Sequence, residues 1–240
     1  MSGWQRIVGS ATLLLVLAAA GPAGAQPSCI QGVVCVVPRQ GSQSVAFHVE
    51  KQSPGPLTVR IEVSGVNMTA TAALPFVRTY EDTTHTLAFV LLPEEEGPLE
   101  FRYSYHVQYG RLGAQHDDAY VYALPYAPGT AHLVVQGYDG ALSHRGRHAI
   151  DWMMPVGTPV HAARPGVVLA VADSSDEGGY DAALLEKANY VAILHEDGTV
   201  ATYAHLQPGS AQVAMGDTVR RGQVLARSGN TGYSSGPHLH

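Results

Sequence analysis

The stretch Phe101-Arg102-Tyr103-Ser104-Tyr105-His106-Val107-Gln108-Tyr109 decides the fold class, because apolar or aromatic residues occupy every second position. Alternation with a period of two gives a strand one face for a core and one for water, which is typical of antiparallel sheets. Residues 57–63 repeat the pattern, and similar strands are expected near residues 45–50 and 86–92, with Gly- and Pro-rich turns between them. The pattern therefore predicts a small β-sandwich over residues from about 29 to 125.

The composition of the sequence changes at Leu124-Pro125-Tyr126-Ala127-Pro128-Gly129, beyond which short runs rich in Val, Ala and Gly predominate. A chain of 240 residues with 45% hydrophobic residues can form one large domain or two small ones. We therefore predict an all-β, mainly antiparallel protein, with a sandwich-like accessory domain over residues 26–125 and a second β-rich domain over residues 126–240. One helical segment is expected at residues 180–187, inside an insertion after Asp173 that could form a lid.

The first 25 residues have the features of a secretory signal peptide. Arg6 precedes an apolar run over residues 13–20, and Ala23-Gly24-Ala25 has the small-x-small pattern of a cleavage site. The run is shorter than the roughly 20 apolar residues that cross a bilayer, so we expect export to the periplasm or beyond and no transmembrane span. A net charge of −6 argues against a nucleic-acid partner, which needs a basic face. The sequence leaves the oligomeric state open.

Cys29 and Cys35 are the two cysteines of the chain. In an oxidising compartment, a pair so close in sequence favours a disulfide that closes a short loop. The alternative is half of a metal site, but a second cysteine pair is missing from the sequence.

The triplet His238-Leu239-His240 is the first indication of a metal or catalytic site. On a strand, residues two apart point to the same face, so both imidazoles can reach one point. Catalytic zinc takes three nitrogen or oxygen ligands and keeps a fourth position for water. His144, Asp151 and His240 could supply them; alternatively, Asp151 caps a turn and His144 is solvated.

Four ordered segments carry a resemblance to a known family: His144 to Asp151 with Pro155 to Val160, Tyr203-Ala204-His205-Leu206, Gly216 to Leu225, and Gly232 to His240. Together they resemble the lysostaphin-type (LytM-type) zinc metalloendopeptidases, which cut bacterial cell-wall peptides. The resemblance implies zinc held by His144, Asp151 and His240, and catalytic roles for His205 and His238. It also implies hydrolysis of peptidoglycan peptides by a metal-activated water.

The first motif departs from the common family spacing of His-x-x-x-Asp, because Arg147 occupies the place of the histidine. His144 lies seven residues before Asp151, and His148 lies three before it. Some relatives have a longer loop before the aspartate, and comparison with them favours His144 as the metal ligand and His148 as a packing residue. His148 as the ligand remains the alternative. The chain ends at His240, where relatives continue, so we expect the final strand to be truncated.

The predicted hairpin around Asp197-Gly198 gives a separate test of whether His205 can reach the site. A two-residue turn at Asp197-Gly198 would pair His205 with Tyr190 and His195 with Val200, which puts the two histidines on opposite faces. A bulge in the hairpin would overturn this assignment.

Three other functions compete with the zinc peptidase. Gly232-Tyr233-Ser234-Ser235-Gly236 matches the Gly-x-Ser-x-Gly motif of serine hydrolases, but that motif needs a strand before it and a helix after it. A carrier domain needs an exposed lysine at a hairpin tip, and residues 216–225 offer none. The leading alternative is a catalytically silent or autoinhibited module that binds cell wall or regulates another hydrolase.

Overall fold

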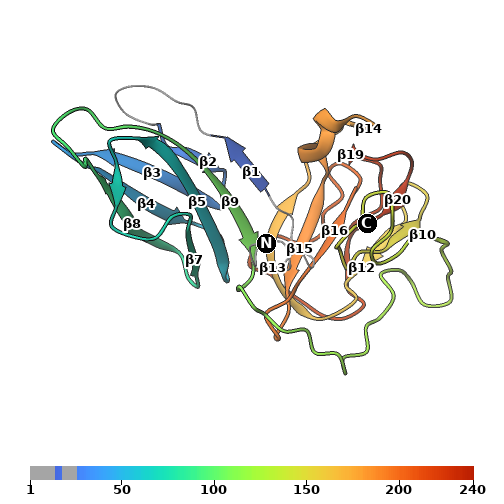
Figure 1. Ribbon diagram of the computed structural model, residues 1–240. Coiled ribbons are helices and arrows are strands. Elements are labelled where there is room, and N and C mark those ends of the chain that lie inside the picture. Colours follow the sequence, from blue (N-terminus) through green and yellow to red (C-terminus); the bar gives the residue numbers. More distant parts are fainter. Residues whose placement is uncertain (1–13, 18–25) are drawn as a thin grey trace. The chain divides into compact units, whose positions relative to one another are not determined.

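The computed structural model describes residues 14–17 and 26–240, and its described residues form two compact units, with the boundary along the chain between Arg111 and Leu112 (Figure 1). The predicted signal peptide lies outside the described residues except for β1 (Leu14–Leu17), whose backbone pairs with β9 (Glu100–Tyr109). The predicted domain boundary at Tyr126 stays a prediction. No described helix has both the length and the apolar composition that crossing a membrane requires.

The N-terminal unit consists of two antiparallel sheets. The first has the strand order β1-β9-β5-β7, and the second has the order β2-β3-β4-β8-β6. The remaining strands of this unit are β2 (Ser28–Ile30), β3 (Val34–Gln40), β4 (Val45–Lys51), β5 (Leu57–Val66), β6 (Thr69–Ala70), β7 (Phe76–Tyr80) and β8 (Thr84–Leu92).

The core of this unit lies between its two sheets. Along β4 and β9, buried residues alternate with partly exposed ones, as the period-two pattern predicts. Phe47 of β4 stacks on Phe89 of β8 in its own sheet and meets the ring edge of Tyr103 from the other sheet at 5.2 Å between centroids. The two sheets therefore pack face to face, and the predicted β-sandwich is confirmed.

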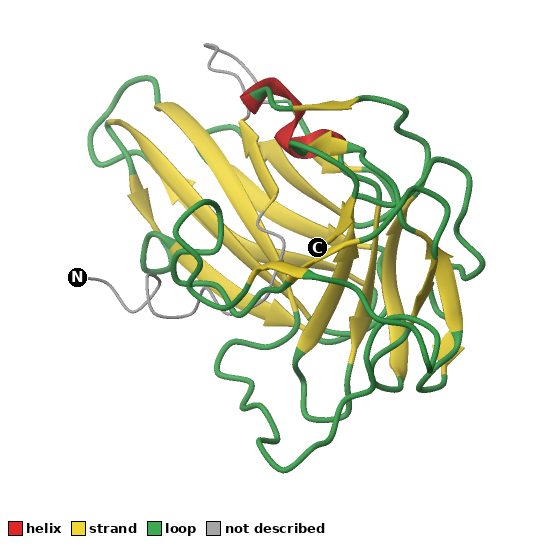
Figure 2. Cartoon of the chain, turned by 90° about the vertical axis from the view of Figure 1, so that its right-hand side faces the viewer, coloured by secondary structure: helices red, strands yellow, loops and turns green. Residues whose placement is uncertain are grey.

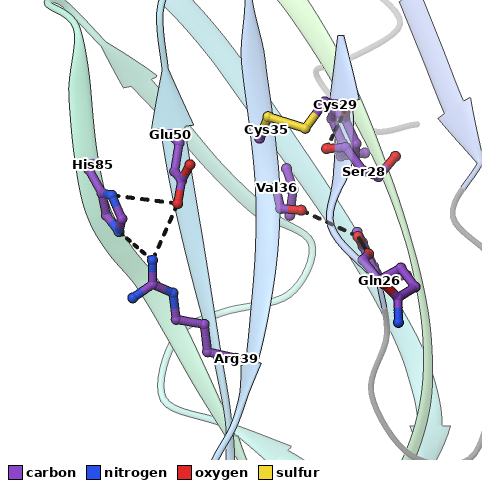
Figure 3. The surroundings of a disulfide bond; sticks show 10 residues. Gln26, Ser28, Cys29, Cys35, Val36, Arg39, Glu50 and His85 are labelled. Carbon is purple, nitrogen blue, oxygen red and sulfur yellow. Dashed lines mark hydrogen bonds and ion pairs between the residues drawn. A yellow bond between two sulfur atoms is a disulfide. The ribbon is translucent and has the colours of Figure 1, made fainter. Parts of the chain in front are cut away.

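A disulfide joins Cys29 of β2 to Cys35 of β3, as predicted (Figure 3). The two cysteines lie directly opposite each other in the antiparallel ladder. The bond ties a three-residue edge strand to the sheet, where few backbone hydrogen bonds could hold it alone. On the same sheet, Arg39 contacts both Glu50 and His85.

The C-terminal unit is a set of small sheets in which every pairing is antiparallel except that of β14 (Gly178–Gly179) with β19 (Gly232–Tyr233). Its largest sheet has the order β16-β15-β13-β17, a three-stranded sheet has the order β10-β11-β20, and β12 pairs with β18. These strands are β10 (Val134–Gln136), β11 (Asp151–Met153), β12 (Pro159–His161), β13 (Gly166–Ala172), β15 (Tyr190–Leu194), β16 (Val200–Ala204), β17 (Thr218–Val219), β18 (Val224–Arg227) and β20 (His238–Leu239). The fold class is mostly antiparallel β, as predicted.

The excursion between β13 and β15 contains the one helix of the described residues, the 3-10 helix η2 (Ala182–Lys187), drawn in red in Figure 2. The helical segment is where the sequence predicts it, and the Asp181 carboxylate caps its first turn by accepting from the Ala183 N–H. The excursion is attached at several points, because β14 pairs with β19 and Asn189 exchanges hydrogen bonds with the backbone of Ser175.

The predicted register of the β15–β16 hairpin is wrong by one residue. Tyr190 pairs with Ala204 and Leu194 with Val200, so His205 lies beyond the paired strand. The turn is longer than two residues: the His195 N–H donates to the Thr199 carbonyl, and Gly198 takes a φ of 82°. A glycine in this conformation forms the bulge that such a loop requires, and the bulge shifts the register.

A buried ion pair fastens the first residues of the C-terminal unit to the rest of that unit. Arg164, which is 5% exposed, donates to the Asp197 carboxylate at 2.6 Å and lies over the ring of Tyr120. Asp197 also accepts from the backbone N–H of Asp117, so this carboxylate joins the leading segment to the β15–β16 turn. Desolvation opposes ionisation, but hydrogen bonds from Thr199, Asp117 and Arg164 hold the pKa of Asp197 well below its usual range.

Replacing Asp197 with Asn should lower the free energy of unfolding of the C-terminal unit by about 3 kcal/mol at pH 7, because it leaves a buried guanidinium unpaired. A carboxyl whose pKa is depressed on folding stabilises above its unfolded pKa of about 4 and loses that contribution as the pH falls. The difference between the two proteins should therefore shrink below about pH 4.

Denaturant unfolding of the full chain across this pH range checks the prediction. Asp118→Asn is the matched control, since that carboxylate is 99% exposed. An equal loss of stability in both variants, or a difference that does not depend on pH, would contradict the assigned role of the ion pair.

Candidate metal centre

The pairing of β11 with β20 brings two distant parts of the chain together. Asp151 is the first residue of β11, and Met153 lies opposite His238 in the antiparallel register. Leu239 is completely buried in the core, so His238 and His240 project from the other face of the strand. The Ala204 N–H donates to the His240 carbonyl, which places the end of β16 beside the same site.

His144, Asp151 and His240 form the one group of potential metal ligands found among the described residues, with ligand atoms all within 4.8 Å of one another. His240 Nδ1 lies 2.8 Å from Asp151 Oδ1, and His144 Nε2 lies 3.2 Å from Asp151 Oδ2. The two ring nitrogens are 3.1 Å apart. Two imidazoles and one carboxylate at this separation are a donor set that fits Zn²⁺. The group is therefore consistent with a zinc site.

His144 and His148 lie in different surroundings, although only three residues separate them. The His144 side chain is fully buried, whereas His148 is exposed and its ring stacks on Tyr138 with centroids 5.1 Å apart. The loop between β10 and β11 is held by backbone bonds from His144 N to Gly140 O and from Arg147 N to His144 O. This tight turn directs His144 inward and leaves His148 outside.

The histidines predicted to be catalytic also reach this site. The rings of His205 and His238 lie 4.5 Å apart between centroids, and His205 lies 5.9 Å from His240. His238 Nε2 is 3.9 Å from Asp151 Oδ1. All five site residues predicted from the sequence therefore lie in one cluster.

Backbone carbonyls fix which ring nitrogen faces the cluster. His144 Nδ1, His205 Nδ1 and His238 Nδ1 contact the carbonyls of Gly137, Thr231 and Gly236, at 2.9, 2.6 and 2.8 Å respectively. A carbonyl oxygen can only accept, so each Nδ1 carries the proton and each Nε2 presents a lone pair when the ring is neutral. His240 is turned the other way and presents Nδ1 to Asp151.

His205 has an unusual backbone conformation. Its φ of 61° lies in the left-handed region, which costs a non-glycine residue of the order of 1 kcal/mol. The surrounding network compensates: the Thr231 hydroxyl donates to the Leu206 carbonyl and accepts from the N–H of Asn189. The same Thr231 supplies the carbonyl that receives the His205 proton, so the network fixes both the backbone and the ring.

The electrostatics of the cluster favour an ionised carboxylate and a neutral His205. Burial opposes ionisation of Asp151, but the hydrogen bond to His240 and the nearby histidines lower its pKa below the ordinary value. Burial, followed by the adjacent His238, lowers the pKa of His205 to about 4. At neutral pH, His205 is therefore a neutral imidazole.

Sequence reasoning missed several supporting residues. Gln136 of β10 donates to Asp151 Oδ2 at 3.1 Å, and Thr231 and Gly137 supply the carbonyls described above. A glutamine at the end of an apolar run gives little indication of such a role without the fold. Ser234 of the Gly-x-Ser-x-Gly segment is buried, and β20 follows it instead of the helix that a serine hydrolase needs.

Comparison with known proteins gives the family of this unit. Residues 145–240 match the model of peptidase family M23, a range that begins one residue after His144. Peptidoglycan DD-endopeptidase ShyA of Vibrio cholerae is 39% identical over 90 residues, which are 38% of this chain and 18% of that protein. Lysostaphin of Staphylococcus simulans is 35% identical over 94 residues, which are 39% of this chain and 17% of lysostaphin.

Among solved structures, the catalytic domain of the same lysostaphin is 30% identical, with a TM-score of 0.33 over 48% of this chain and 77% of that one. The chain spans about a fifth of the length of the curated relatives it matches. The ordered motifs and the matched range agree on the same part of the chain. Through residues 145–240, the chain belongs to peptidase family M23, the lysostaphin (LytM) type.

Proposed function

We propose that the protein is a zinc-dependent endopeptidase that hydrolyses peptide bonds of bacterial peptidoglycan. The observation that carries the proposal is the convergence of His144, Asp151 and His240 within 4.8 Å, inside a domain of family M23. Curated relatives of this domain include a peptidoglycan DD-endopeptidase and lysostaphin. The disulfide agrees with a protein exported to an oxidising compartment, which is where peptidoglycan lies.

In this proposal, His144 Nε2, His240 Nδ1 and an oxygen of Asp151 hold the metal. When bound, Zn²⁺ supplies a water of lowered pKa and a positive charge next to the scissile carbonyl. Despite burial, the hydrogen bond from His240 and the nearby histidines lower the pKa of Asp151, so its carboxylate is ionised. The Gly137 carbonyl holds the Nδ1–H of His144, so the ring turns Nε2 toward the site as the ligand atom.

His205 and His238 carry out the proton transfers in this proposal. Both present a bare Nε2 when neutral, because both Nδ1 protons are held by backbone carbonyls. The imidazole that is neutral takes a proton from the attacking water on its bare Nε2 and delivers a proton to the leaving amine. The other imidazole stabilises the tetrahedral oxyanion in its protonated form, by donating its Nε2–H. Their rings are 4.5 Å apart between centroids, so one substrate carbonyl can contact both.

The choice of metal ligand is tested with two histidines of the same loop. His144→Ala should reduce zinc affinity by more than the roughly 100-fold that the loss of an outer-shell partner can cost, because it removes a ligand. His148→Ala should bind zinc as the wild type does, because that ring lies outside the cluster. Zinc dissociation constants by chelator competition make the comparison. Loss of zinc in His148→Ala and its retention in His144→Ala would contradict the ligand set.

The catalytic assignment is tested by separating zinc binding from turnover. His205→Asn and His238→Asn should each bind zinc and lose about 10²- to 10⁴-fold in kcat on purified peptidoglycan, because asparagine can neither accept a proton nor carry the positive charge of an imidazolium. Asparagine tolerates the left-handed backbone at position 205 better than alanine does.

His161→Asn is the matched control for the two turnover variants, since His161 bonds to the Gly222 carbonyl and lies outside the cluster. Wild-type turnover in His205→Asn would remove His205 from the mechanism. Zinc bound by a wild type that does not hydrolyse peptidoglycan would support the catalytically silent module instead.

A further inference from the structure

We infer that Gln136 is a positioning residue that aligns two of the proposed zinc ligands at once, and this inference rests on the proposed function. Gln136 is the last residue of β10, and its backbone lies opposite Asp151 in the β10–β11 ladder, at a register shift. The shift directs its side chain between the start of β11 and the loop that carries His144.

The carboxamide of Gln136 uses its full hydrogen-bonding capacity. Its Oε1 accepts from the backbone N–H groups of Leu142 and Ser143, each at 3.1 Å. Its Nε2 donates to Ser143 Oγ at 2.8 Å and to Asp151 Oδ2 at 3.1 Å. A carboxamide has two donor hydrogens and two acceptor lone pairs, so all four are occupied.

These partners also settle which way the amide is turned. The oxygen must face the two backbone N–H donors, so the nitrogen faces the carboxylate. One of its two N–H groups therefore occupies a lone pair of Asp151 Oδ2, while Oδ1 lies toward His240 Nδ1 at 2.8 Å. The amide thus selects the orientation of the carboxylate.

The same side chain fixes the approach to His144. Leu142 and Ser143 immediately precede that histidine, and Leu142 is 89% exposed, so its own side chain contributes little packing. The two hydrogen bonds to Gln136 Oε1 hold the backbone that leads to the ligand. One residue therefore links the loop of His144 to the strand of Asp151, and outer-shell partners of this kind contribute to metal affinity by orienting the ligands.

The test compares zinc binding by the full chain and by Gln136→Met, which keeps the side-chain length and loses all four hydrogen bonds. We expect zinc affinity by chelator competition to fall about 10- to 100-fold, and the visible spectrum of the cobalt-loaded protein to change. Gln212→Met is the matched control, because Gln212 is exposed in the same unit, and it should bind both metals as the wild type does. Ser143→Ala removes only one acceptor and should stay within a few-fold of the wild type.

Thermal unfolding of the metal-free proteins shows whether a variant is folded, so that a loss of zinc affinity in a folded variant can be assigned to positioning of the ligands.

Gln136→Asn replaces Gln136→Met if the methionine variant does not fold. Asparagine keeps an amide but is too short to bridge both partners, so we expect the same loss of zinc affinity. A folded Gln136 variant with wild-type zinc affinity and cobalt spectrum overturns this inference alone. A wild type that binds no zinc overturns the proposed function together with it.

Discussion

The antiparallel pairing of β11 with β20 is the constraint on which the site depends. It brings Asp151 within hydrogen-bond distance of His240, although the two are 89 positions apart in the sequence. Both strands are very short, so few ladder hydrogen bonds hold them. The fully buried Leu239 on one face of β20 fixes the direction of the two histidines on the other. The alternation of side chains along β20 therefore places Leu239 in the core and the two histidines in the site.

Backbone carbonyls then determine the protonation pattern. Three of the four histidines in the cluster donate Nδ1–H to main-chain oxygens, and those oxygens lie in loops held by other side chains, such as Thr231 with Asn189. A main-chain carbonyl cannot change its role from acceptor to donor, so the ring orientation is fixed more firmly than by another titrating group. The positive φ of His205 costs some local stability, and this backbone conformation directs the ring into the cluster.

Much of the fold and of the cluster could be predicted from sequence. Period-two alternation predicts the sandwich, because burial on one face imposes it directly, and the His-x-His triplet predicts two rings on one face for the same reason. The β15–β16 register could not be predicted in this way, since Glu196, Asp197 and Gly198 allow either a two-residue turn or a longer one with a bulge. Gln136 was missed because an amide has no preferred place in a sequence pattern, and its role arises only when β10 and the His144 loop meet.

The most direct measurement of the central claim is hydrolysis of purified peptidoglycan by one preparation of known metal content, before and after chelation and after zinc is returned. The account predicts about one zinc per chain, loss of hydrolysis with the chelator, and its recovery with zinc. Hydrolysis that continues at an unchanged rate in the metal-free protein would contradict it.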